Sequence, residues 1–257
     1  WEGYSVRFLA TQEEYTIFEK LLVYFFSLFR YGHEAVLLFF VLSGFVIHLR
    51  YSKSLKANRS AGFDLSNYLK RRILRIFPPL ALALVITFIL DQVGLCLQLP
   101  VYEHATKYAT INQNISTDHN LSTVLGNLLF VMDIYTPVFG TNGSLWSLAY
   151  EWWFYLLYPA FFLLIRKSQL LATGAVIVLY FVINWLQLEM KLATKVFSLF
   201  PVWWFGVLLA EIYTGRSRIK FKHLMPLALL ILIVPFHTLS TPLRAFNQIL
   251  WGLAFSG

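Results

Sequence analysis

The chain has 257 residues, of which 58% are apolar even without counting glycine, and only 13% carry a charge. Globular domains hold about 45–50% apolar residues with glycine included, and about 25% charged residues. A soluble domain of this composition would leave a large apolar surface in water. A disordered chain and a soluble nucleic-acid-binding domain are excluded on the same ground, despite a net charge of +8. We therefore expect an all-α fold, a polytopic bundle of transmembrane helices.

Stretches of about 20 apolar residues mark the expected spans. They are 34–50, 76–97, 144–165, 169–188, 196–213 and 223–240, and a seventh begins near residue 245. Residues 15–30 are more polar and suit an amphipathic helix at the membrane surface. Residues 121–136 are too short for a span and suggest an interfacial or re-entrant segment. We expect one membrane domain over 1–257, incomplete at both ends.

The basic residues predict the orientation, because Lys and Arg accumulate in cytoplasmic loops. Fourteen of the 21 fall in three segments, 50–75, 166–168 and 214–223. Alternating helices place all three on one side, which we expect to be cytoplasmic, and leave the long loop 98–143 extracytoplasmic. The same alternation puts residues 1–33 outside and predicts a further helix upstream of Trp1.

A histidine and a carboxylate stand side by side near the start of the first span, at His33 and Glu34. Such a pair can transfer protons in catalysis, although both residues can also lie in interfacial water without a catalytic role. Further along this span, Ser43 and Gly44 interrupt an apolar run. Small residues let a second helix approach closely, so for Ser43 we favour packing over a role as nucleophile.

A cluster of cations, KRRILRIFPP, occupies residues 70–79. Arg72 and Arg75 are three residues apart and share a helix face. Clustered guanidinium groups suit a phosphate-bearing ligand, while a simple positive anchor at the membrane surface explains some of these cations equally well. We expect Pro78 and Pro79 to begin or kink the next helix.

Glu151 lies inside the apolar stretch GSLWSLAYEWWFYLLYP at residues 143–159. A carboxylate in lipid is costly unless it is paired, so a functional role is expected. Ser144 and Ser147 share its helix face and, with Trp146 and Tyr150, are candidates for substrate contact. The aromatic residues of this stretch also suit an interfacial belt.

Other ionisable residues carry weaker signals. We expect Asp91 and Glu211, near helix ends, to reach interfacial water by snorkelling. His48, His223 and His237 show no metal-binding spacing, so no metal site is expected. The single cysteine, Cys96, excludes an internal disulfide.

At its three motif blocks the chain resembles the acyltransferase 3 family, integral-membrane enzymes that O-acylate sugars and other hydroxyl acceptors. The matching strings are GHEAVLLFFVLSGFVI at 32–47, YLKRRILRIFPP at 68–79 and GSLWSLAYEWWFYLLYP at 143–159. The resemblance implies transfer of an acyl group, by default acetyl and not aminoacyl, from cytoplasmic acyl-CoA. The implied acceptor is an envelope glycan, a lipid-linked sugar or a small metabolite, and the implied location is a bacterial inner membrane or a plasma membrane.

The resemblance also implies residue roles. Arg71, Arg72 and Arg75 fit the family's basic motif near the phosphates of acyl-CoA, a co-substrate; no permanently bound cofactor is expected. Glu151 matches the family's membrane carboxylate, which orients or charge-balances the site. The family's first helix carries a His as general base, and no His precedes His33, so we expect this base upstream of Trp1 and do not transfer its role to His33. Besides the lipid bilayer, the expected partners are acyl-CoA and a hydroxyl acceptor, with no nucleic acid.

Two other function classes are weighed against this one. A transporter or flippase for a glycan or lipid-linked intermediate would use the polar face of Ser144, Ser147 and Glu151 as a translocation path. It leaves the arginine cluster unexplained, and the inverted repeats of many carriers are not visible. A purely structural membrane subunit has no need of a carboxylate at Glu151.

Overall fold

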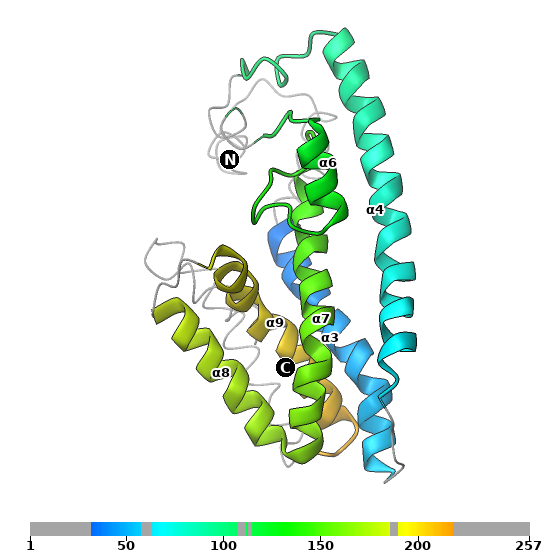
Figure 1. Cartoon of the computed structure of the whole chain (residues 1–257), viewed down its shortest axis with the longest axis vertical. Helices are drawn as coiled ribbons and strands as arrows, with labels where there is room; N and C mark the ends of the chain where they lie inside the picture. Colours follow the sequence, from blue (N-terminus) through cyan, green and yellow to red (C-terminus); the bar gives the residue numbers. More distant parts are fainter. Residues whose placement is uncertain (1–31, 58–62, 107–111, 113–114, 186–189, 218–257) are drawn as a thin grey trace, which may run out of the picture.

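A computed structural model of the protein describes residues 32–57, 63–106, 112, 115–185 and 190–217. Within these residues the fold is a bundle of long helices without named strands (Figure 1), which confirms the all-α prediction. The elements are α3 (Gly32–Lys56), α4 (Leu65–Cys96), α6 (Leu121–Leu128), the 3₁₀ turn η3 (Gly143–Leu145), α7 (Trp146–Lys167), α8 (Gln169–Trp185) and α9 (Lys191–Tyr213).

Five of the predicted spans are confirmed as helices. Four helical segments, α3, α4, η3 with α7, and α9, are long and apolar enough to cross a membrane, and α8 is a shorter apolar helix. The predicted interfacial segment contains the eight-residue helix α6, which is too short to span. The predicted helices at 15–30, at 223–240 and from residue 245 lie outside the described residues.

Helix α4 begins earlier than its proline pair suggests. The Asp64 side chain caps the helix by accepting a hydrogen bond from the backbone N–H of Asn67 at 3.0 Å. The hydrogen bonds from Asn67 also lower the pKa of the Asp64 carboxyl. Pro78 and Pro79 therefore lie inside the helix, and the prediction that they begin it is wrong. Each proline removes one backbone hydrogen bond, but the capped turns before it already fix the helical direction.

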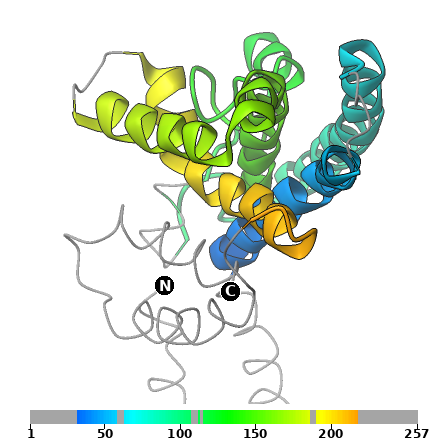
Figure 2. The ribbon, with the colours of Figure 1, turned by 90° about the horizontal axis from the view of Figure 1, so that it is seen from below.

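Helix α9 packs between α3 and α8, and α7 contacts α3, α4, α8 and α9. Figure 2 shows this arrangement from below, with α9 crossing α3. The α3–α9 crossing is close because two glycines lie in it. A Cβ on Gly44 would stand 2.2 Å from the carbonyl oxygen of Trp203, and one on Gly206 would stand 1.9 Å from that of Val41. The predicted close approach at Gly44 is thus confirmed.

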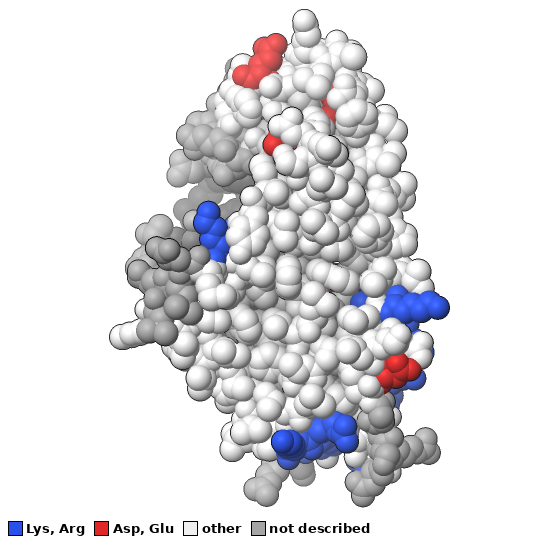
Figure 3. Space-filling model, viewed as in Figure 1, with Lys and Arg blue, Asp and Glu red and all other residues white. Residues whose placement is uncertain are grey.

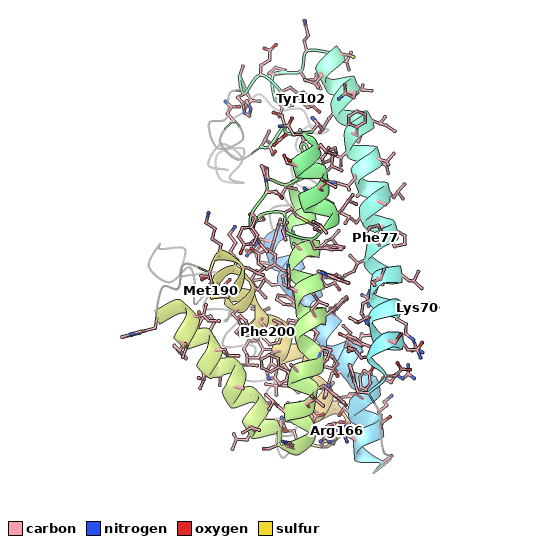
Figure 4. All side chains as sticks on the ribbon, viewed as in Figure 1. Lys70, Phe77, Tyr102, Arg166, Met190 and Phe200 are labelled. Atoms are coloured by element: carbon pink, nitrogen blue, oxygen red, sulfur yellow. The ribbon has the colours of Figure 1, made fainter. Side chains whose placement is uncertain are left out.

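Aromatic side chains fill the centre of the bundle. Phe40, Phe154, Phe200 and Trp203 are fully buried, and the rings of Phe200 and Trp203 stack at 5.7 Å. Figure 4 shows Phe200 among the side chains between α7, α8 and α9. Helix α4 is different, because apolar side chains such as Leu82 and Ile89 remain exposed along it, as expected for a face in contact with lipid.

The two ends of the bundle differ in charge. Helices α3 and α7 both end in cations, Lys53 and Lys56 on α3 and Arg166 and Lys167 on α7, and the arginine cluster lies in the first turns of α4. We call this the basic end. Figure 3 shows most of the visible Lys and Arg gathered toward it, and Figure 4 shows Tyr102 and Arg166 at opposite ends.

Candidate active site

Glu151 is buried on the side of α7 that faces α3, and one of its carboxylate oxygens is hydrogen-bonded. Its side chain is 2% exposed. Its Oε1 accepts a hydrogen bond from the Ser43 hydroxyl at 3.0 Å and another from the Tyr155 hydroxyl. The Ser43 and Tyr155 hydroxyl oxygens are themselves 3.1 Å apart. These three residues form what we call the Glu151 cluster, a carboxylate held in apolar surroundings by two hydroxyl groups.

Arg72 reaches this cluster from α4. Its guanidinium carbon lies 5.4 Å from the ring centre of Tyr68 and 5.3 Å from that of Tyr155, so the cation rests against two aromatic faces. Its Nε is buried and has no hydrogen-bond partner among the described residues. A buried donor without a partner costs free energy, so it is a position where a ligand oxygen would bind favourably.

The other two arginines of the cluster stand differently. Arg75 is exposed. Arg71 is also exposed. The structure therefore brings Arg72 to the Glu151 cluster, whereas Arg71 and Arg75 lie at the surface.

A cavity of about 1050 Å³ opens at the end of the bundle opposite the basic end. It is enclosed by the first turns of α3, α7 and α9 and by the loop before α7. Residues that line it include His33, Asp133, Thr141, Trp146, Tyr150 and Lys195. The His33 and Trp146 rings stack at 5.7 Å. The Glu151 cluster begins five residues further into α7 than Trp146, about 7.5 Å along the helix axis.

The structure sorts the predicted site residues into two groups. Trp146, Tyr150 and His33 line the cavity, whereas Glu34 does not. Ser144 and Ser147 do not line it either, and they make local contacts: Ser144 donates to the Asn142 side chain, and Ser147 donates to the Ser144 carbonyl. The predicted polar face of α7 is thus divided, because the two serines stay in the first turns while Glu151 pairs with α3.

Asp91 does not snorkel, contrary to the sequence-based expectation. It is 1% exposed and accepts hydrogen bonds from the Tyr102 hydroxyl at 3.0 Å, from His119 Nε2 at 2.7 Å, and from the backbone N–H and hydroxyl of Thr141 at 3.0 and 2.6 Å. Burial, together with the bond to Asp91, raises the pKa of the Tyr102 hydroxyl. One carboxylate thus fixes three parts of the outer loop to α4, including the cavity wall at Thr141.

Glu211 does not snorkel either. It is 1% exposed, and its Oε1 accepts from Arg216 Nη1 at 2.8 Å and from His48 Nε2 at 2.7 Å. His48 is fully buried, and its Nδ1 lies 2.8 Å from the Tyr158 hydroxyl. Ionisable groups in membrane helices usually have partners, so a partner could have been expected from the sequence for both Glu211 and His48. Their distance along the chain hid the pairing.

Sequence reasoning also missed Tyr155, Asp133 and Lys195. Tyr155 follows Glu151 by one helical turn, a spacing that places both on the same face and was a usable signal. Asp133 and Lys195 meet at the wall of the cavity, with Lys195 Nζ 3.0 Å from Asp133 Oδ2. They come from segments far apart in the chain, and nothing in the local pattern pairs them.

Comparison with known families bears on this arrangement. A family model described as an acyltransferase domain, that of the acyltransferase 3 family, matches residues 8–256. Searches of curated proteins and of solved structures give no match. The family match includes all three motif blocks and every residue of the site described above. Because it covers nearly the whole sequence, the chain belongs to the acyltransferase 3 family.

Proposed function

We propose that the protein is an integral-membrane O-acyltransferase that moves an acyl group, by default acetyl, from acyl-CoA to a hydroxyl group. The acceptor class is an envelope glycan, a lipid-linked sugar or a small metabolite. The main support is the position of the Glu151 cluster, which lies between the guanidinium of Arg72, whose Nε is buried, and the cavity at the opposite end. Two substrates that enter the bundle from opposite ends would meet at the Glu151 cluster.

The donor side of the proposal rests on arginine chemistry. Arg72 and Arg75 hold phosphate oxygens of acyl-CoA, and the unpartnered Nε of Arg72 supplies a donor in a water-poor site. Arg71, nearer the surface, adds positive charge that attracts the anionic donor. This assignment puts the basic end in the cytoplasm, where acyl-CoA is found, and the cavity on the extracytoplasmic side.

On the acceptor side, the hydroxyl group enters through the cavity past Trp146 and Tyr150. Its oxygen attacks the acyl carbon, and the carbon–sulfur bond breaks. The hydroxyl proton passes to a general base, and the thiolate of CoA takes up a proton. Glu151, hydrogen-bonded to Ser43 and Tyr155, orients the reacting groups and balances their charge.

The test uses the full-length protein in membranes with radiolabelled acetyl-CoA and envelope extract. We expect wild-type protein to transfer label to a hydroxyl acceptor. Glu151→Gln should lower the rate by about 100-fold or more, because the amide keeps the size but not the charge of the carboxylate. The matched control is Glu103→Gln, which neutralises an exposed carboxylate in the outer loop and should leave the rate unchanged.

Two outcomes would contradict the proposal. Label transfer that persists undiminished in Glu151→Gln would exclude the assigned site. Movement of a glycan or lipid-linked sugar across the membrane without any label transfer would instead favour the transporter alternative.

A further inference from the structure

The carboxylate of Asp133 is held ready at the wall of the cavity. The Tyr150 hydroxyl donates to its Oδ2 at 2.8 Å, and Lys195 Nζ approaches the same oxygen at 3.0 Å. The other oxygen, Oδ1, has no hydrogen-bond partner among the described residues. The side chain is 38% exposed. One oxygen is therefore anchored while the other remains free to accept a hydrogen bond from a ligand.

The backbone around Asp133 is built to present it. Asp133 and Phe130 both have positive φ angles, 62° and 57°, in the left-handed region that side chains seldom adopt. Two residues of the bundle hold this turn: Trp153 Nε1 donates to the Phe130 carbonyl at 2.9 Å, and the Asn127 side chain donates to the Pro137 carbonyl at 3.1 Å. Such strain, fixed by its surroundings, is typical of sites that position a ligand.

The charges at the cavity wall compensate each other. Lys195 donates to the backbone carbonyl of Asp133 as well as to its carboxylate, so one cation and one anion of the lining neutralise each other. The rest of the described lining holds hydroxyl groups such as those of Thr141 and Tyr150, the rings of Trp146 and His33, and several apolar side chains. Because this pair is neutral, the cavity wall offers no net positive charge to a phosphate or carboxylate ligand. The hydroxyl groups of a neutral ligand, in contrast, can both donate to the acceptors of the wall and accept from its donors.

We propose that Asp133, Lys195 and Tyr150 form a recognition site for an uncharged, polyhydroxylated acceptor, a neutral carbohydrate. Asp133 Oδ1 accepts a hydrogen bond from an acceptor hydroxyl, and Trp146 supplies an aromatic face beside it. The inference rests on the proposed acyltransferase function, because it takes the cavity as the acceptor site. It goes further by naming the charge of the acceptor and the residues that select it.

The experiment compares two acceptor probes, a neutral glucose trisaccharide and the same trisaccharide bearing one phosphate. Binding to purified full-length protein in lipid nanodiscs is measured by calorimetry, and label transfer from acetyl-CoA is measured alongside. We expect wild-type protein to prefer the neutral probe. In Asp133→Asn the amide oxygen stays with the two donors, Tyr150 and Lys195, and an NH2 group replaces Oδ1, so the charge-assisted hydrogen bond to the acceptor hydroxyl is lost and binding of the neutral probe should weaken by about tenfold or more.

The same variant has a second, opposite effect, which a merely structural role would not produce. Asp133→Asn leaves Lys195 without its counter-charge, so binding of the phosphorylated probe should strengthen while the KM for acetyl-CoA stays unchanged. Lys195→Met combined with Asp133→Asn should abolish that gain by restoring neutrality. Glu103→Gln serves again as the exposed-carboxylate control and should change neither probe.

The outcomes separate the two claims. Suppose that the wild-type protein transfers acetyl groups, but that Asp133→Asn weakens binding of both probes equally or leaves binding of both unchanged. The recognition site is then wrong, and the acyltransferase proposal stands. If no acceptor is acetylated by wild-type protein, the acyltransferase proposal fails. In that case a preference of the wild-type protein for the phosphorylated probe in calorimetry would also overturn the neutral site.

Discussion

Arg72 differs from the neighbouring cations because two aromatic faces enclose it. Its guanidinium lies against Tyr68 and Tyr155, whose hydroxyl donates to the buried Glu151, whereas Lys70 two residues earlier is exposed. A planar guanidinium can stack on rings and still offer hydrogen bonds at its edge, which an ammonium group cannot do in the same way. Two cations within one turn of the helix thus lie in different environments, Arg72 against aromatic rings and Lys70 at the surface.

This contrast yields a prediction for the donor site. Arg72→Lys keeps the charge but loses the stacked plane and the buried Nε donor, so the KM for acetyl-CoA should rise by about tenfold or more, as expected for the loss of one charged hydrogen bond. Steady-state label transfer at varied acetyl-CoA measures it. Lys70→Gln removes a charge from the same helical turn and should leave this KM within about twofold. An unchanged KM in Arg72→Lys would remove the arginine from the donor site.

Whether a buried polar residue could be predicted from the sequence depends on whether its partner lies nearby in the chain. Glu151 could be predicted because a carboxylate in an apolar helix is costly, and the cost is visible in one segment of sequence. His48 and Glu211 carry the same cost, but their positions near helix ends suggested water as the partner. The structure supplies a protein partner 163 residues away instead. Asp133 and Lys195 could not be predicted, because their pairing depends on how a loop closes over α9.

At the scale of elements, the α3–α9 crossing holds the site together. The close approach at Gly44 and Gly206 is followed toward the basic end by polar contacts at regular intervals along α3, from His48 to Glu211, from Ser52 to Thr214 and from Lys56 to the Thr214 carbonyl. Gly215, with φ of 71°, ends α9 and turns Arg216 back onto Glu211. The helices themselves were predictable from apolar length, but this crossing was only half visible, at Ser43 and Gly44.

The crossing can be tested with a pair of glycine variants. Gly206→Ala places a methyl group against the Val41 carbonyl, so it should destabilise the protein by about 1–3 kcal/mol, as overpacking does. Gly174→Ala is the control, because a Cβ there meets nothing within 4 Å. Alanine is also the better helix former, by roughly 0.5–1 kcal/mol. Thermal unfolding in detergent measures both variants, and an equal or higher melting temperature for Gly206→Ala would contradict the packing described.

At the scale of the whole molecule, the bundle has two chemically different ends. Cations close the ends of α3 and α7 and the start of α4, while the opposite end carries the cavity and the Asp91 contacts. Our assignment of these ends to the cytoplasm and the outside rests on the distribution of Lys and Arg. It predicts that a reagent unable to cross membranes will reach only one of them.

Cys96 offers a direct measurement, because it is the single cysteine of the chain and is exposed at the end of α4 that lies away from the basic end. A membrane-impermeant maleimide added to intact cells should label it. In the double variant Cys96→Ser with Arg166→Cys, labelling should require permeabilised cells, since Arg166 lies in the last turn of α7 at the basic end. Reversed labelling of the two positions would invert the proposed orientation.

The pairing of His48 with Glu211 also implies a delay during synthesis, because α3 is made well before α9. The two residues are 163 positions apart, and ribosomes add about 5–20 residues per second, so α3 waits about 8–30 s for α9 to be made. During that interval His48 lies in a nascent span without its carboxylate, and Gly44 has no helix against it. Helix α3 therefore completes its packing only after α9 has been made. Slowed translation between α8 and α9 would lengthen the exposure of this segment to quality-control proteases.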